Sequence, residues 1–240
     1  MTWPFENDTS GIVKRISNRS ISANRKRNIF IVLTIVLASA LLSAIVLYGF
    51  GVMQETQNRN QKTAQIMYHA ISEQQGQELY KQEEIAWVGE FFNAFSEQVN
   101  HSTVNFTYAN ADMLTSQSMP YSGDLPASEN EIVVQESFLD SLGYSNELGQ
   151  TIQIPFSDGT THDFKLTGIL DVKTGDIGRY TAIISKELVR QQYGDGGMID
   201  YYIGLKGAQN MSEEEATNYA NTLAQQLKIS DDNVIVRSTY

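Results

Sequence analysis

The sequence contains no cysteine among its 240 residues, and it has only four prolines and three histidines. Without cysteine the chain forms no disulfide bond and carries no lipid-modified cysteine as a membrane anchor. The stability of an exported part must therefore come from a packed core. About 185 residues follow the longest apolar run, which is enough for one or two small packed units.

Charge is also missing from one long stretch. No charged residue occurs in the 25 positions from Ile29 to Met53. A helix of this length extends about 37 Å, and the hydrocarbon core of a bilayer is about 30 Å thick. A core helix of a soluble domain would show a polar stripe, and a cleavable signal has an apolar region of about 7–15 residues. The sequence therefore predicts a retained transmembrane helix at residues 28–53.

Basic residues gather before this apolar run. Residues 1–27 contain six basic and two acidic residues, whereas residues 54–240 contain 11 basic and 26 acidic residues, a net charge of −15. Because Lys and Arg beside a span stay in the cytoplasm, we expect residues 1–27 inside and residues 54–240 outside the cell. The acidic exterior argues against a nucleic-acid partner, since phosphate binding needs a basic footprint.

Residues 1–27, which we call the leader, contain apolar residues at helical spacing. Ile12, Val13 and Ile16 are spaced as on one face of a helix, with cations between them. This pattern predicts a basic amphipathic helix on the inner leaflet, and a disordered basic tail is the alternative.

Two helices are predicted directly after the span. Residues 54–82 are polar and contain no proline, which predicts a stalk helix that continues the span outward. Residues 84–99 carry apolar side chains at spacings of 3, 4, 3 and 4, which predicts an amphipathic helix. The residues of this pattern are Ile85, Val88, Phe92, Phe95 and Val99.

From residue 103 onward the pattern changes to short strands and helices. Strands are predicted from alternation and turn signals, including a hairpin at Asp158-Gly159, and Ser212 with Glu215 forms a capping box that begins a helix. The fold class is therefore α+β, with one transmembrane helix followed by an extracytoplasmic split α/β lobe. This lobe comprises residues 83–109 and 198–240, and residues 110–197 form an inserted β-rich lobe.

Residues for chemistry are sparse. The sequence has neither a nucleophile elbow nor a phosphate-binding loop. The histidines, His69, His101 and His162, lie in three separate segments without partners at metal-ligand spacing. The acidic run 213–215 fits the first turn of a helix, where negative charge is favourable, and Asp231-Asp232 is a weak candidate for calcium. We therefore predict no catalytic, cofactor-binding or metal-binding residue.

Several short stretches resemble the permease subunits of ABC transporters of the FtsX/MacB type. In those proteins a basic amphipathic helix ends in an Arg-Asn pair and leads into the first span, as Arg27-Asn28 does here. The extracytoplasmic part is similar in its series of a Leu-Pro pair, an Asn-Glu-Ile-Val strand, a Gly-x-Thr-Ile strand and a strand closing on Thr-Gly-Ile. The corresponding residues are Leu125-Pro126, Asn130–Val133, Gly149–Ile152 and Thr167–Ile169.

The resemblance implies a mechanical function. A separate cytoplasmic ABC ATPase subunit would hydrolyse ATP, and the helix after Met53 would carry the movement to the outer face, for export or mechanical work. The further partners that it implies are membrane lipid, other permease spans or a second permease copy, and an extracellular peptide, lipid or protein.

The resemblance also raises an expectation about length and location. Such permeases have further spans after this region, so we expect a fragment cut before the second span, and the composition suits a Gram-positive cell surface. The alternatives are a single-span anchored extracellular binding or sensor domain, and an anchored enzyme.

Overall fold

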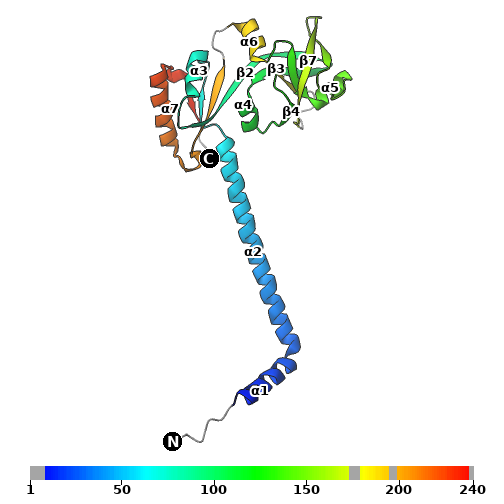
Figure 1. The fold of residues 1–240 in the computed structure, drawn as a ribbon, viewed down its shortest axis with the longest axis vertical. Helices are drawn as coiled ribbons and strands as arrows, with labels where there is room; N and C mark the ends of the chain where they lie inside the picture. The colour runs from blue at the N-terminus through cyan, green and yellow to red at the C-terminus, as the bar shows by residue number, and fades with distance from the viewer. Residues whose placement is uncertain (1–8, 173–178, 195–198, 238–240) are drawn as a thin grey trace. The chain divides into compact units, whose positions relative to one another are not determined.

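The computed structural model describes residues 9–172, 179–194 and 199–237 (Figure 1). The chain divides into two compact units, Met1–Thr56 and Gln57–Tyr240.

The first unit is helical. Helix α1 covers Ser10–Ala23, and helix α2 begins at Arg25 and continues to Lys62. Within α2, Arg25–Glu55 is long and apolar enough to cross a membrane, by length and composition. The predicted span at residues 28–53 lies inside this segment. The predicted amphipathic segment around Ile12, Val13 and Ile16 lies in helix α1, residues 1–8 of the leader lie outside the described residues, and a location on a membrane surface stays a prediction.

The predicted stalk helix at residues 54–82 is wrong beyond Lys62. Helix α2 ends there, strand β1 covers Ile66–Tyr68, and helix α3 covers Glu73–Leu79. A capping box starts α3: the side chain of Ser72 accepts a hydrogen bond from the backbone of Gln75, and the Gln75 side chain accepts one from the backbone of Ser72. This arrangement satisfies two N–H groups that a helix start leaves open, so α3 is an independent helix.

The predicted helix at residues 84–99 is wrong, because this segment is the long strand β2, Ile85–Val99. Its pairing shifts register twice, between Ile85 and Trp87 against β9 and between Asn93 and Phe95 against β3. Each shift adds one residue to the strand. The spacing of three from Ile85 to Val88 and from Phe92 to Phe95 is therefore one strand period plus one bulge residue.

The ten strands found in the described residues belong to one sheet, ordered β10-β1-β9-β2-β3-β8-β5-β7-β4, with β6 paired to β7. The remaining strands are β3 Ser102–Ala109, β4 Tyr121–Gly123, β5 Glu131–Gln135, β6 Thr151–Pro155, β7 Thr161–Leu170, β8 Arg179–Ile184, β9 Asp200–Leu205 and β10 Val234–Val236. The remaining α-helices are α4 Ala111–Ser116, α5 Glu136–Leu142, α6 Lys186–Tyr193 and α7 Glu213–Leu227.

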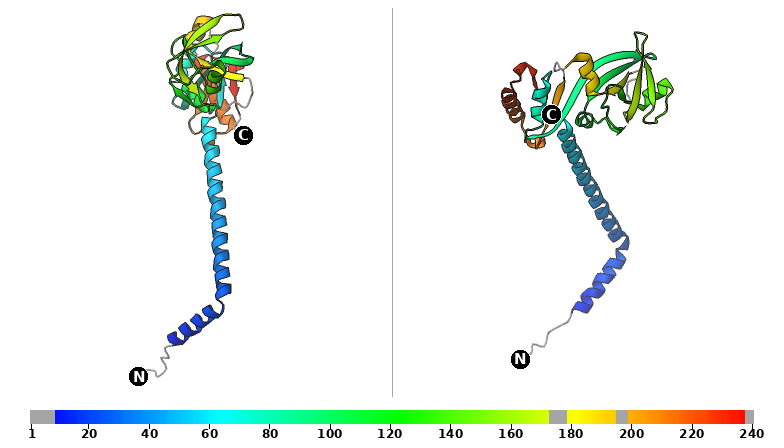
Figure 2. Two further views of the ribbon diagram at one scale, coloured as in Figure 1. Left: turned by 90° about the vertical axis from the view of Figure 1, so that its right-hand side faces the viewer. Right: turned by 45° about the horizontal axis from the view of Figure 1, so that its top comes forward.

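The sheet has three hydrophobic cores. In the first core, α3 and α7 pack on β1, β9 and the start of β2. In the second core, α5 and α6 pack on β3, β5, β6, β7 and β8 and on the end of β2. In the third core, α4 packs on β5, β7 and β8. Figures 1 and 2 show α3 and α7 at one end of the sheet and α5 and β7 at the other, with β2 between them.

Most other predicted elements are confirmed. The hairpin turn has Gly159 at φ +86° between the antiparallel strands β6 and β7, and the capping box of Ser212 and Glu215 begins α7. The segment after residue 109 contains the short helix α4 and the short strand β4. The division into lobes at residues 109 and 198 stays a prediction.

Candidate functional site: the junction of α2 with the sheet

The side chains that could take part in catalysis or metal binding lie far from one another in the fold. His69 follows β1 and contacts the carboxylate of Asp200 at 2.6 Å, whereas His162 on β7 contacts the Thr160 hydroxyl at 3.0 Å. His101 lies in the turn between β2 and β3. Among the described residues no group of three or more His, Asp or Glu could hold a metal ion. The predicted absence of catalytic, cofactor and metal residues stays a prediction.

The most constrained place is where α2 meets the sheet. Only three residues separate Lys62 from β1, and one of them is Gln65, which is 2% exposed. The Gln65 N–H donates to the Ile203 carbonyl at 2.9 Å, and the Gln65 carbonyl accepts from Arg237 N–H at 2.8 Å. The Gln65 side-chain oxygen accepts from Leu205 N–H at 2.8 Å. This one residue therefore fixes the end of α2 to β9 and to the chain after β10.

Strand β1, which follows Gln65, is hydrogen-bonded to strands on both of its edges and to helix α7. It pairs with β10 along one edge and with β9 along the other. The hydroxyl of Tyr68, which is fully buried, donates to the Ala220 carbonyl of α7 at 3.0 Å. Burial, and to a lesser degree Tyr219, raises the pKa of Tyr68 well above its usual value, so its hydroxyl stays a neutral donor. Strand β1 is therefore attached to both neighbouring strands and to α7.

Trp87 is placed beside this junction by local backbone geometry. The first β-bulge of β2 lies between Ile85 and Trp87 and changes the direction of the side chain. The indole lies over Gly204 of β9, where an added Cβ would lie 1.9 Å from the Trp87 Nε1. Only glycine leaves room for the ring there. The arrangement was not predictable from the residue types, because it depends on the bulge.

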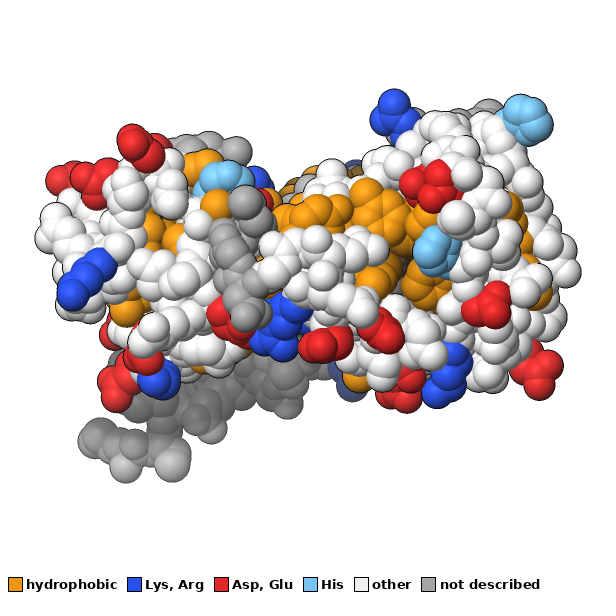
Figure 3. All heavy atoms as spheres, turned by 90° about the horizontal axis from the view of Figure 1, so that it is seen from above, with side chains coloured by type: hydrophobic (Ala, Val, Ile, Leu, Met, Phe, Trp, Pro, Cys, Tyr) orange, Lys and Arg blue, Asp and Glu red, His pale blue; other side chains and the backbone are white. Residues whose placement is uncertain are grey.

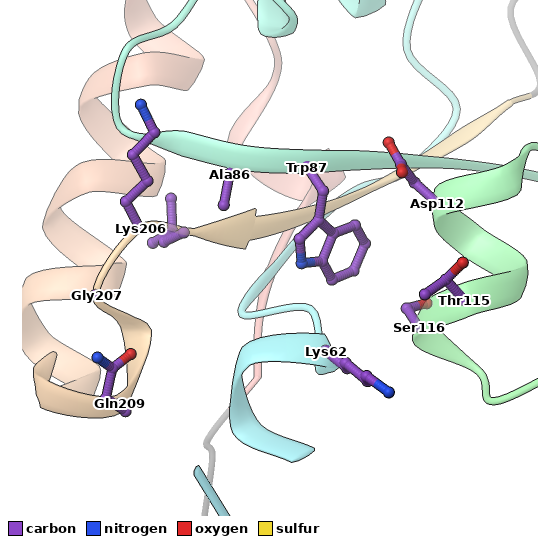
Figure 4. Close-up of a pocket in the computed structure, with 10 residues that line it drawn as sticks. Lys62, Ala86, Trp87, Asp112, Thr115, Ser116, Lys206, Gly207 and Gln209 are labelled. Atoms are coloured by element: carbon purple, nitrogen blue, oxygen red, sulfur yellow. The ribbon is translucent and has the colours of Figure 1, made fainter. Parts of the chain in front are cut away.

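A cavity of about 450 Å³ adjoins the indole. In the middle of Figure 4 is Trp87, one of the residues that line the cavity. The figure also shows Lys62 at the end of α2, and Thr115 and Ser116 on α4. The hydroxyls of Thr115 and Ser116 donate to carbonyls of their own helix at 2.8 Å. The residues around the cavity are Lys62, Ala86, Trp87, Asp112, Thr115, Ser116, Leu205, Lys206, Gly207 and Gln209. Its volume is within the range of ligand pockets.

A second exposed feature is apolar. Hydrophobic side chains gather in the middle of the face shown in Figure 3. Partly buried aromatic rings on the second core make edge-to-face pairs, Phe95 with Phe156 at 5.9 Å and Phe92 with the exposed ring of Tyr193 at 5.2 Å. Phe92 and Phe95 on strand β2 and Phe156 after β6 thus contribute to the packing of the second core.

Comparisons with known proteins agree with this architecture. Residues 29–223 match the model of the MacB-like periplasmic core domain family. The periplasmic region of MacB from Actinobacillus actinomycetemcomitans has a TM-score of 0.51 at 12% identity, over 72% of this chain and 87% of that chain. The extracellular domain of the noncanonic ABC-type transporter YknZ from Gram-positive bacteria has a TM-score of 0.51 at 10% identity, over 73% and 100%. No curated protein sequence matches the chain significantly.

Proposed function

Because the chain belongs to the family of the MacB-like periplasmic core domain, we propose that it is part of a permease subunit of an FtsX/MacB-type ABC transporter. A separate cytoplasmic ATPase subunit supplies the energy, and the chain couples ATP hydrolysis to export or mechanical work at the outer face of the membrane. The family match and the likeness to the MacB and YknZ structures support this proposal. Within the membrane, the proposed partner of this span is another permease span or a second copy of the permease.

The proposed topology follows from charge. Residues 1–27 lie in the cytoplasm, the apolar segment of α2 crosses the bilayer, and residues 54–240 lie outside. An extracytoplasmic location, at a Gram-positive cell surface, suits the acidic and cysteine-free composition of these residues.

The observation that carries the proposal is the short, hydrogen-bonded connection from α2 to β1. Helix α2 continues for nine residues beyond Met53 as far as Lys62, a distance of about 14 Å at 1.5 Å per residue. The chain then enters the sheet within three residues and is fixed by Gln65. A helix connected in this way transmits displacement, whereas a flexible linker of the same length would absorb it.

The decisive experiment is isolation of the full-length protein from its own cells in mild detergent. We expect a nucleotide-binding subunit to co-purify in a stable ratio, and ATP hydrolysis by the complex to change when α2 is interrupted by Gly-Gly insertion after Lys62. The same insertion before Ser10 is the control. A protein that purifies without an ATPase subunit under conditions that keep it folded would contradict the proposal.

The topology has a separate test, since the cysteine-free chain gives no background labelling. Ser20→Cys lies in α1 and Ser137→Cys lies in α5, and both side chains are exposed. A membrane-impermeant maleimide applied to intact cells should label the Ser137→Cys protein and should reach Ser20→Cys only after lysis. The reverse order of labelling would show that the proposed orientation is wrong.

A single-span anchored binding domain is the second candidate. The cavity beside Trp87 favours it, since its walls combine an indole with charged and hydroxyl side chains. The co-purification experiment separates the two functions, because a binding domain has no need of an ATPase subunit.

A further inference from the structure

A buried charge lies in the middle of β2, between the first and second cores. The Glu90 side chain is 5% exposed. Its carboxylate accepts hydrogen bonds from the Tyr80 hydroxyl at 2.9 Å, from the Tyr108 hydroxyl at 2.6 Å and from the Lys186 ammonium at 2.9 Å. These donors come from the end of α3, from β3 and from α6. A buried carboxylate needs such partners, because burial of an unpaired charge is very costly.

The same lysine reaches a second carboxylate. Lys186 Nζ lies 3.2 Å from Glu73 on α3, and Arg190 on α6 also forms an ion pair with Glu73. Helix α3 packs in the first core and α6 packs in the second, so the two pairs with Glu73 join the two cores across more than 110 residues of sequence. Figure 1 shows α3 and α6 near one another on the same side of β2. We call Glu73, Glu90, Lys186 and Arg190 the polar bridge.

The opposite side of β2 makes a different kind of contact. Phe91, the residue after Glu90, packs with Met113 and Leu114 of α4 in the third core, and Tyr202 of β9 packs there too. The Phe91 and Tyr202 rings meet edge to face at 6.3 Å. The two cores are thus joined by apolar packing on one face of the sheet and by charges on the other.

The polar bridge also borders an unsatisfied group. The Tyr201 hydroxyl of β9 is buried and has no hydrogen-bond partner among the described residues. Its ring lies against Gly76 of α3, where an added Cβ would be 2.1 Å away. Burial, and after it the charges of Glu90 and Glu73, raise the pKa of Tyr201. A buried hydroxyl without a partner costs free energy, and this cost would be removed wherever water could reach the hydroxyl.

We propose that the polar bridge is a latch that holds the first and second cores at a fixed angle, with the α4 side of β2 as the hinge. The latch can open because Glu73, Lys186 and Arg190 are between 19% and 39% exposed and regain water when they separate. Opening separates Glu73 from Lys186 and Arg190, whereas Glu90 keeps Lys186 and the hydroxyls of Tyr80 and Tyr108, so that no buried charge is left unpaired. The apolar contacts at α4 cannot separate so readily, since separation would expose hydrocarbon to water.

The inference is independent of the proposed transport function and has its own readout. Two spin labels are attached to the full-length chain in detergent micelles, through Asn221→Cys on α7 and Ser137→Cys on α5, both exposed. Pulsed electron spin resonance then gives the distance distribution between the first and second cores. We expect one narrow distribution for the otherwise natural sequence, and a broader one with an added population in Lys186→Met.

Three variants define the controls. Lys186→Arg keeps the charge and should restore the narrow distribution. Lys81→Met breaks the exposed pair with Glu78, 2.6 Å apart within one segment, and should leave the distribution unchanged. Tyr201→Phe removes the unsatisfied hydroxyl and should reduce the added population when combined with Lys186→Met.

Should Lys186→Met not fold, Glu73→Gln provides the same test, because it removes the connection to α3 and leaves Glu90 paired with Lys186. A folded Lys186→Met or Glu73→Gln protein with the distribution of the natural sequence would overturn the latch. An equal broadening in Lys81→Met would overturn it as well, since that pair does not join the cores.

Discussion

Replacing Gln65 by leucine tests the junction that the proposed function depends on. The two side chains are similar in size, so the substitution removes polarity without opening a large cavity. Leu205 N–H then loses the acceptor that lies at 2.8 Å. Because Leu205 is only 4% exposed, water cannot replace the hydrogen bond that its N–H loses.

The substitution also removes the hydrogen bond from the Gln65 amide to the carbonyl of Thr63, but Thr63 is exposed and water can replace that bond. The magnitude therefore follows from the unpaired N–H of Leu205. A buried N–H without a partner costs about 1–3 kcal/mol. For a folded unit of this size each kcal/mol lowers the melting temperature by about 2–4 °C. We therefore expect Gln65→Leu to melt about 2–12 °C below the natural sequence. The backbone hydrogen bonds of Gln65 to Ile203 and Arg237 remain and limit the loss.

The assay is thermal unfolding of the full chain in nonionic detergent, followed by circular dichroism at a wavelength where strands dominate. Gln153→Leu is the matched control, because the Gln153 amide donates to Asp163 at 2.9 Å on the exposed face of β6. That change should alter stability by less than about 0.5 kcal/mol. Equal melting temperatures for Gln65→Leu and Gln153→Leu would refute the reasoning.

Two further predictions concern other contacts. Gly204→Ala should displace the Trp87 indole, because the new Cβ would lie 1.9 Å from its Nε1. Overpacking of this kind costs about 1–3 kcal/mol, and Trp87 emission should change in a Trp3→Phe background that leaves one tryptophan. An unchanged emission spectrum would show that the ring is not held there. Glu73 should make stability depend on acid: burial acts to raise its pKa, but the hydrogen bonds and charges of Lys186 and Arg190 outweigh burial and lower it below 4.5. The stabilisation is complete above the unfolded pKa of 4.5 and is lost as pH falls through the lower folded value. The difference in melting temperature between the natural chain and Glu73→Gln should therefore shrink below pH 4.5, and a constant difference down to pH 3 would contradict this.

The apolar helix and the family were predictable from sequence. A run of 25 residues without charge has few structural solutions, and residues 25–55 are helical as this run predicts. The resemblance to FtsX/MacB-type permeases is confirmed by the family match over residues 29–223. Local signals for turns and caps, such as Gly159 and the Ser212 capping box, were also reliable because short-range hydrogen bonds determine them.

The apolar spacing at residues 84–99 predicted a helix where the structure has strand β2, and the reason is physical. A bulge adds one residue to a strand, so two bulges in 15 residues convert spacings of 2 and 4 into the 3, 4, 3, 4 of a helix. In the predicted stalk, the Ser72–Gln75 capping box was the available signal that a new helix begins. The contacts of Gln65, Glu90 and Trp87 could not be predicted, because each joins segments far apart in sequence through the sheet register.

Strand β2 has a consequence for exchange of parts between relatives. Its first half pairs with β9 in the first core, and its second half pairs with β3 in the second. Because β2 belongs to both cores, no boundary separates them in sequence. The second core therefore cannot be replaced by that of another protein without also replacing β2. A chimera would succeed only if the donor supplied a β2 with both bulges in the same positions, since a strand lacking one would present every later side chain to the wrong face.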